Sequence, residues 1–312
     1  MDTRRLKYFV RIVELGSLTR SAEVLHIAQP ALSQQVIALE KFFGKRLLIR
    51  SKKGVVPTEA GNTLYRHAQQ ILKQMEQARS EIDSAMTMLT GTVSIGVAPY
   101  SSASVMVLPL LMAAREKYPG IVMHINENFS SAISEMVTSR KLDMALIYDP
   151  GKMKGLTFEH ILDEEICLIG SKKAMSHFDG KPIGIEQIPY ENMILPSQIH
   201  LLRSQFESVC AKAGFKPRII AEIESLTLLS AAVAKGLGYS LLPVSVARDL
   251  NNSQDIDWIK IDKEVFGIKM ALCSSDVKSF SEPAIAINNL IHDIAEELGL
   301  IERSVREQKI KP

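Results

Sequence analysis

A patch of short polar side chains lies in residues 28–40, which read AQPALSQQVIALE. With about 100° of rotation per helical residue, one face carries only apolar side chains: Leu32, Val36, Leu39 and Phe43. The opposite face carries Pro30, Ser33, Gln34, Ile37 and Lys41, while Gln35 turns toward the packed side. Ser and Gln offer both donors and acceptors, whereas an ordinary solvated face is usually built from Glu and Lys. The pattern therefore predicts a helix whose outer face reads a polar partner, with a chance surface composition as the alternative.

Two shorter helical patterns precede this segment. The first, RRLKYFVRIVELG, places Leu6, Phe9, Val10 and Val13 at helical spacing and stops at Gly16. The second, LTRSAEVLHI, follows Ser17 as its cap and turns Ala22 and Leu25 inward. A turn of three or four residues then leads into residues 28–40. This is the spacing of a helix-turn-helix, whose second helix lies in the major groove of DNA.

Two aliphatic runs follow, separated by SKKG in the segment RLLIRSKKGVVPT. They predict a β-hairpin with a basic tip, where Arg50, Lys52 and Lys53 would contact phosphates or enter a minor groove. A merely solvated hairpin tip is the alternative. Residues 1–60 hold 11 Lys and Arg against 5 Asp and Glu, and the remainder holds 26 against 30. The basic charge is therefore concentrated where the DNA contacts are expected.

Residues 4–61 resemble the winged helix-turn-helix of LysR-type transcriptional regulators, through FVRIVELGS, AQPALSQQVIALE, GKRLLIR and TEAG. RRLKYFV and IAQPALSQQV are most similar to the nitrogen assimilation control branch of that family. Two departures are Ala28, where members often have Ser or Thr, and Gln34, where Arg is frequent. The expected DNA contacts are Ser17, Thr19, Gln29, Pro30, Ser33, Gln34, Arg50, Lys52 and Lys53. The expected winged domain spans residues 1–58.

A long helix is expected over residues 59–90, which contain no proline and follow the capping residue Thr58. Such a helix would extend about 48 Å, too far to bury against one small domain. A heptad seam runs through Leu64, Ala68, Ile71, Met75, Ala78 and Ile82. The seam predicts a dimerisation helix, with packing inside the chain as the alternative. The resemblance likewise implies antiparallel linker helices that pair two winged domains.

Strand-like and helix-like segments alternate across residues 91–305, which indicates an α/β unit with parallel strands. The resemblance implies two lobes of the periplasmic-binding-protein type that take up an effector. Lobe 1 is expected at about 91–163 and 268–300, and lobe 2 at about 164–267. The crossing strands are placed near EEICLIG and FGIKMALC, and residues 306–312 are expected to form a tail.

Hydroxyl side chains follow several of the expected strands. Ligands of open α/β sheets gather at the carboxyl ends of strands, and the N-termini of helices favour anions. The candidate contacts for a small carboxylate-type effector are Ser101, Ser102, Phe129, Ser130, Tyr148, Ser197, Ser225 and Thr227. Ordinary helix caps, and core positions for the two aromatic residues, are the alternatives.

Several classes of function are disfavoured by composition and missing motifs. The hydrophobic content of 46% and charged content of 23% are ordinary for a globular protein. The longest apolar run, residues 105–114, contains Pro109 and is too short to span a bilayer, so a cytoplasmic protein without membrane contact is expected. Cys167, Cys210 and Cys273 form no CxxC pair, so we expect no metal and no disulfide. Catalytic motifs are missing too, and neither an enzyme nor a cofactor is expected.

The leading hypothesis is a homo-oligomeric, sequence-specific regulator of transcription, with promoter DNA and RNA polymerase as partners and an effector between the lobes. Activator or repressor, dimer or tetramer, and a role in nitrogen assimilation all remain open at this point. Two other classes stay in consideration. One is an enzyme or transport-type receptor whose N-terminal unit serves only assembly, and the other is an architectural nucleoid protein with little sequence preference.

Overall fold

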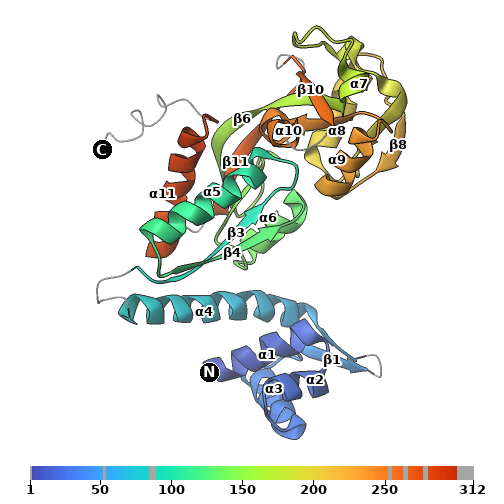
Figure 1. Ribbon diagram of the computed structural model, residues 1–312. Helices are drawn as coiled ribbons and strands as arrows, with labels where there is room; N and C mark the ends of the chain where they lie inside the picture. Colours follow the sequence, from blue (N-terminus) through green and yellow to red (C-terminus); the bar gives the residue numbers. More distant parts are fainter. Residues whose placement is uncertain are drawn as a thin grey trace. The chain divides into compact units, whose positions relative to one another are not determined.

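The computed structural model describes residues 2–51, 54–83, 89–251, 255–262, 266–276 and 280–300 (Figure 1). The chain divides into two compact units. One is formed mainly by residues 1–88, and the other by residues 89–312 apart from 139–141. The predicted tail, residues 306–312, lies outside the described residues.

The first unit consists of a three-helix cluster, a hairpin and a longer helix. Its elements are α1 (Thr3–Leu15), α2 (Leu18–Val24), α3 (Gln29–Phe43), β1 (Leu48–Ser51), β2 (Gly54–Pro57) and α4 (Glu59–Asp83). Gly16 ends α1 in the left-handed region at φ 61°, and the Ser17 hydroxyl caps α2 by accepting from the Arg20 amide. β1 and β2 pair antiparallel. The predicted helix-turn-helix and hairpin are confirmed.

The core of this unit is built from one face of each helix. Leu6, Phe9 and Ile12 of α1 are buried together with Leu32, Val36 and Leu39 of α3. Val10 and Val13 are partly buried against this core, beside the fully buried Ile12. One expectation, that Phe43 is buried, was wrong. Phe43 is 41% exposed, because α3 ends there and Gly44 turns the chain away.

The helix α4 packs against α1 within its own unit. Leu64 and Ala68 are buried in the same core, so their expected role in dimerisation is corrected: they have no surface left for a partner. Ile71 lines that core, Met75 is 48% exposed and Ala78 is exposed. The Ile82 side chain lies outside the described residues. The seam thus changes from intrachain packing to an open face partway along the helix.

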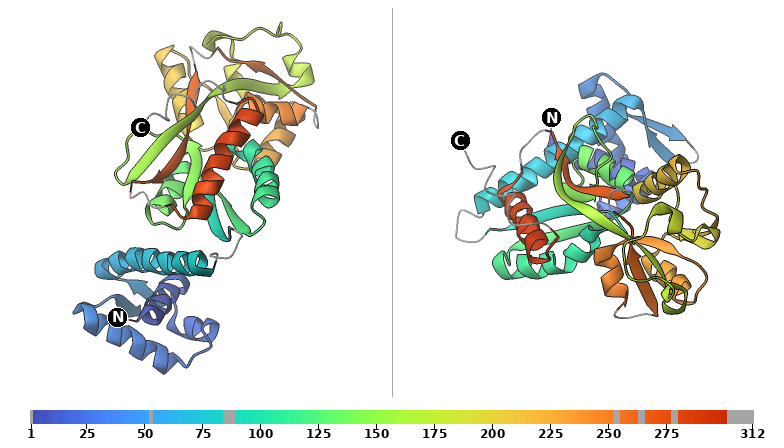
Figure 2. Two further views of the ribbon diagram at one scale, coloured as in Figure 1. Left: turned by 90° about the vertical axis from the view of Figure 1, so that its left-hand side faces the viewer. Right: turned by 90° about the horizontal axis from the view of Figure 1, so that it is seen from above.

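Lobe 1 of the second unit is a sheet in the order β6-β11-β5-β3-β4, in which β6 spans Leu156–Ser171. Its elements are β3 (Gly91–Val97), α5 (Ser102–Lys117), β4 (Ile121–Glu127), α6 (Ser130–Thr138), β5 (Met144–Tyr148), β11 (Gly267–Ser275) and α11 (Glu282–Glu297). β3 pairs parallel with β4 and β5, whereas β11 pairs antiparallel with β5 and β6. The sheet is therefore mixed rather than wholly parallel. The helices α5 and α11 lie next to each other (Figure 2). Alternate residues of β5 pack toward these two helices on one side of the sheet and toward α6 on the other.

Lobe 2 is built around strands that pair with the second half of β6 (Leu156–Ser171). β9 (Ser240–Pro243) and β10 (Ile256–Lys260) flank it antiparallel, and β7 (Met193–Leu195) pairs parallel with β8 (Ile219–Glu222). The helical elements are α7 (Lys172–Met175), η1 (Ile185–Gln187), η2 (Tyr190–Asn192), α8 (Leu201–Lys212), α9 (Leu226–Ala234) and α10 (Val244–Asn251).

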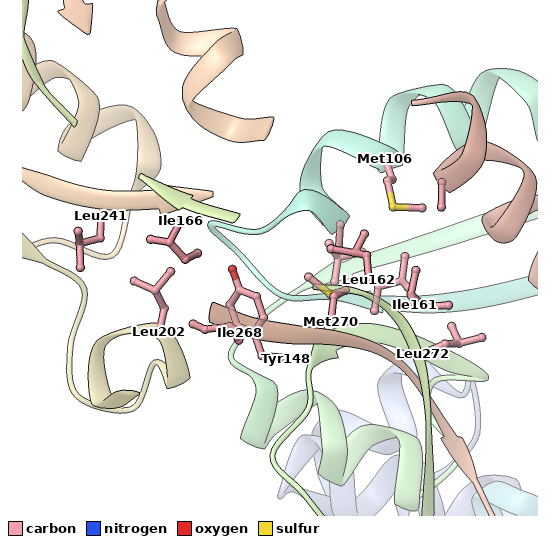
Figure 3. Close-up of a cluster of buried hydrophobic side chains, with 14 of the residues drawn as sticks. Met106, Tyr148, Ile161, Leu162, Ile166, Leu202, Leu241, Ile268, Met270 and Leu272 are labelled. Carbon is pink, nitrogen blue, oxygen red and sulfur yellow. The ribbon is translucent and has the colours of Figure 1, made fainter. Parts of the chain in front are cut away.

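The strand β6 belongs to both lobes. Its residues up to Glu165 pair with β11, and from Ile166 onward they pair with β9 and β10. A continuous core follows this strand (Figure 3). It runs from Met106 and Leu162 in lobe 1, past Tyr148 and Ile166, to Leu241 in lobe 2. The strand therefore fixes where the two lobes meet.

Candidate nucleic-acid interface and inter-lobe site

The outer face of α3 is free of core contacts. Gln29, Pro30 and Gln34 are exposed, and Ser33 is half-buried. Ile37 stands on the same face, 54% exposed. Gln35 turns inward as predicted, and its Oε1 accepts from Arg5 Nε at 3.0 Å. The face thus presents amide groups for hydrogen bonding beside one aliphatic side chain.

The hairpin reaches this face through Arg50. Arg50 Nη1 donates to Ser33 Oγ at 2.8 Å, so the base of the predicted wing and α3 share one polar surface. Lys52 and Lys53 lie outside the described residues. Ser17 is occupied as the cap of α2, and Thr19 in the first turn is exposed. The expected DNA contacts in the described residues therefore come from α2, α3 and β1.

Glu40 positions the hairpin, a role that the sequence reading missed. Its Oε1 accepts from the amide of Leu47 at 2.8 Å and from that of Leu48 at 3.2 Å. This carboxylate holds the start of β1 to the last turn of α3. The sequence alone gave no signal for this role; the structure reveals it, because Glu40 is half-buried in the last turn of α3.

Three of the expected effector contacts are buried and already bonded. The Ser101 hydroxyl donates to the Ala98 carbonyl at 2.6 Å. The Tyr148 hydroxyl donates to the Tyr100 carbonyl at 2.8 Å. The Ser102 amide and hydroxyl both donate to the carboxylate of Glu164. Because they are buried and bonded within the chain, Ser101, Ser102 and Tyr148 are corrected from effector contacts to structural residues.

The partner of Ser102 is Glu164 on β6. The Ser102 amide donates to Glu164 Oε1 at 2.8 Å, and its hydroxyl donates to Oε2 at 2.6 Å. The Ser102 hydroxyl also lies 2.7 Å from Ser245 Oγ at the start of α10. Burial raises the pKa of Glu164 to about 7, although the bonds from Ser102 act in the opposite direction.

A second group gathers around His200, just before α8. The ring of Phe129 meets the His200 ring edge-on at a centroid distance of 4.9 Å, and that of Tyr100 does so at 5.5 Å. His200 Nε2 lies 3.1 Å from Glu224 Oε2, and the Ser197 amide donates to Glu224 Oε1 at 3.0 Å. Burial lowers the pKa of His200. Residues of lobe 1 and lobe 2 therefore meet at one imidazole ring.

Tyr100 adds a direct contact between the lobes. Its hydroxyl donates to the Ile223 carbonyl at 3.1 Å. Its backbone has φ 56°, an uncommon conformation for a residue other than glycine. Burial, and then the nearby carboxylates of Glu224 and Glu127, raise the pKa of its hydroxyl. The sequence gave no signal for this contact between the lobes. An aromatic residue that follows a strand is common in loops, and nothing in the sequence sets Tyr100 apart.

The remaining predicted effector residues lie at or near the surface. Ser130 begins α6, Ser225 caps α9 by accepting from the Leu228 amide, and Thr227 is exposed in the first turn of α9. The Ser197 hydroxyl oxygen is buried and has no hydrogen-bond partner among the described residues. Phe129 and Ser197 join the His200 group directly, and Ser225 is adjacent in sequence to Glu224.

Within the described part of the chain, no group of three or more His, Cys, Asp or Glu residues could hold a metal ion. Cys167, Cys210 and Cys273 are free and buried. Among the described helices, none is long and apolar enough to cross a membrane.

A winged helix-turn-helix and a bilobal α/β unit in one chain are typical of two-domain transcriptional regulators. Residues 3–62 match the model of the bacterial regulatory helix-turn-helix protein, lysR family, and residues 87–282 match the LysR substrate binding domain. The chain belongs to the LysR family of transcriptional regulators, whose members are regulators and not enzymes.

Individual relatives agree with this assignment. The nitrogen assimilation regulatory protein Nac of Escherichia coli (strain K12) is 39% identical, covering 94% of this chain and 95% of that protein. Nac of Klebsiella aerogenes is 37% identical, covering 98% and 99%. A full-length variant of OxyR from Pseudomonas aeruginosa has the same fold, with a TM-score of 0.71, 23% identity and 94% coverage of both chains. CbnR in complex with its target DNA has a TM-score of 0.67, with 21% identity and coverage of 96% and 100%.

Proposed function

We propose that this regulator acts on genes of nitrogen assimilation and recognises its operators through the outer face of α3. The observation that carries the DNA contact is the exposed Gln29 and Gln34 pair with Arg50 bonded beside it at Ser33. The nitrogen role is supported by the relatives named Nac. Basic side chains fix the register on phosphates, and the amides read base edges. A Gln amide paired with adenine contributes about 1 to 3 kcal/mol of discrimination.

The test compares two neighbouring glutamines that face opposite ways. Genome-wide occupancy of the tagged protein under nitrogen limitation first supplies the operator. Gln34→Ala is then expected to lose most of the preference for this operator over scrambled DNA, measured by fluorescence anisotropy. Gln35→Ala, whose side chain bonds Arg5, is the control and should keep it.

A wing variant separates base reading from charge. Lys53→Ala is expected to weaken binding to both DNAs and to flatten the salt dependence. Unchanged preference in Gln34→Ala would overturn base reading by α3. Occupancy confined to genes unrelated to nitrogen would overturn the assigned pathway while leaving DNA reading intact.

The remaining parts of the proposal concern assembly and control. Two chains pair through the second half of α4, where Met75 and Ala78 are exposed. The protein works in the cytoplasm and contacts RNA polymerase at its promoters. Its effector is a small carboxylate-type molecule that contacts Phe129, Ser130, Ser197, Ser225 and Thr227. The N-termini of α6 and α9 and the unpartnered Ser197 hydroxyl support this placement.

A further inference from the structure

A carboxylate already occupies the start of α5. Glu164 is 3% exposed, and both of its oxygens accept hydrogen bonds from Ser102. A free backbone amide and a hydroxyl at a helix N-terminus are the donors expected for an anionic ligand. Here the ligand is a side chain of the same protein, contributed by the strand that passes between the lobes.

The hydroxyl of Ser245 gives this contact a third member. Ser102 has one hydroxyl proton, and with Glu164 ionised that proton goes to the carboxylate. The Ser102 oxygen must then accept the proton of Ser245 at 2.7 Å. Donors therefore run in one direction, from Ser245 of lobe 2 through Ser102 of lobe 1 to Glu164 of β6. Hydrogen bonds in such a chain strengthen one another.

We propose that the start of α5 is a carboxylate site which the chain fills with its own Glu164, and that this internal ligand holds the two lobes together through Ser102 and Ser245. An external carboxylate binds there only when the Glu164 side chain is removed. The inference goes beyond the proposed function, because Ser102 is not among the proposed effector contacts, and it does not depend on that function. Its tests use the full chain without DNA.

The first test is chemical rescue. Glu164→Ala should melt at a lower temperature than the wild type, and millimolar acetate or formate should raise its melting temperature in a saturable way. Chloride at the same ionic strength should not do so. Glu165→Ala is the matched control, because that neighbouring carboxylate is exposed and pairs with Lys260 on the surface. The double variant Glu164→Ala with Ser102→Ala should lose the rescue.

The second test does not require removal of the buried Glu164 side chain. It therefore remains available if Glu164→Ala fails to fold. At pH 8, where Glu164 is ionised, Ser245→Ala should lower the melting temperature of the wild type more than it lowers that of Glu164→Gln, whose amide cannot act as the anionic end of the chain. Equal shifts in both backgrounds would overturn the tie between the lobes. A carboxylate response of the same size in the wild type, Glu165→Ala and Glu164→Ala would overturn the site. Neither outcome depends on whether the chain reads an operator.

Discussion

The Glu164 carboxyl combines deep burial with a pKa near 7, well above its ordinary value of 4.5. An acid whose pKa rises on folding favours the folded state at low pH, because the folded state holds the proton more tightly than the unfolded chain does. That contribution is complete below pH 4.5 and is lost as the pH rises through 7. The same residue therefore holds the lobes together and makes the fold weaker in alkali.

Replacing this group with an amide should remove the pH dependence. The free energy of unfolding of Glu164→Gln, relative to the wild type, is expected to rise by about 3 kcal/mol between pH 4 and pH 8, because only the wild type must ionise a buried acid. Urea unfolding across that range measures it, with Glu165→Gln as the exposed control. Parallel curves for Glu164→Gln and the wild type would show that Glu164 does not titrate in this range.

Among the elements, α4 starts in direct contact with the backbone of the chain that precedes it. A methyl group on Gly61 would lie 2.0 Å from the Leu47 carbonyl oxygen and 3.1 Å from Pro57 Cβ. Leu47 is also held by Glu40 of α3. The start of α4, the hairpin and α3 are therefore fixed to one another at a single point.

Two glycine variants distinguish this close approach from backbone strain. Gly61→Ala should destabilise the first unit by about 3 kcal/mol or more, because backbone atoms must move. Gly44→Ala should cost about 1 to 2 kcal/mol, because Gly44 has φ 62° but open space around it. Differential scanning calorimetry of the full chain measures both. Equal losses would mean that α4 shifts freely on the hairpin.

Local sequence patterns predicted most of these elements. They did not predict the contacts between residues that are far apart in the sequence. Helical spacing and capping placed α1, α2 and α3, and the change of rhythm after residue 90 placed the α/β unit. The first half of β6 was missed, because charged residues such as Glu159 and Asp163 interrupt its apolar pattern. Glu164 was missed as a site residue because Ser102 lies 62 positions away in sequence. A hydroxyl at a helix start looks the same in sequence whether its partner is a ligand or a distant side chain.

At the scale of the whole molecule, the two halves of α4 have different surroundings. Leu64 and Ala68 complete the core of the winged unit, whereas Met75 and Ala78 are exposed. A heptad pattern alone cannot make this distinction, because packing within one chain and packing against a second chain use the same residue spacing. Self-association should therefore depend on the second half of the helix.

Charge substitutions at the two ends of the seam should have different effects. Met75→Glu is expected to shift sedimentation toward the monomer with little change in melting temperature. Leu64→Glu is expected to unfold the winged unit, because it places a charge in a closed core. Met75→Gln controls for the loss of the methionine alone. An unchanged sedimentation coefficient for Met75→Glu would exclude this part of α4 from the interface.

The strand β6 changes partners between Glu165 and Ile166, so consecutive residues of one strand hydrogen-bond to the sheets of different lobes. Because the core is also continuous past this point, neither lobe has a complete set of neighbours when it is cut from the other. We therefore expect the two lobes to unfold as one cooperative unit. A natural or engineered division of this regulator would have to fall before residue 91, where the second unit's first strand begins, rather than between the lobes.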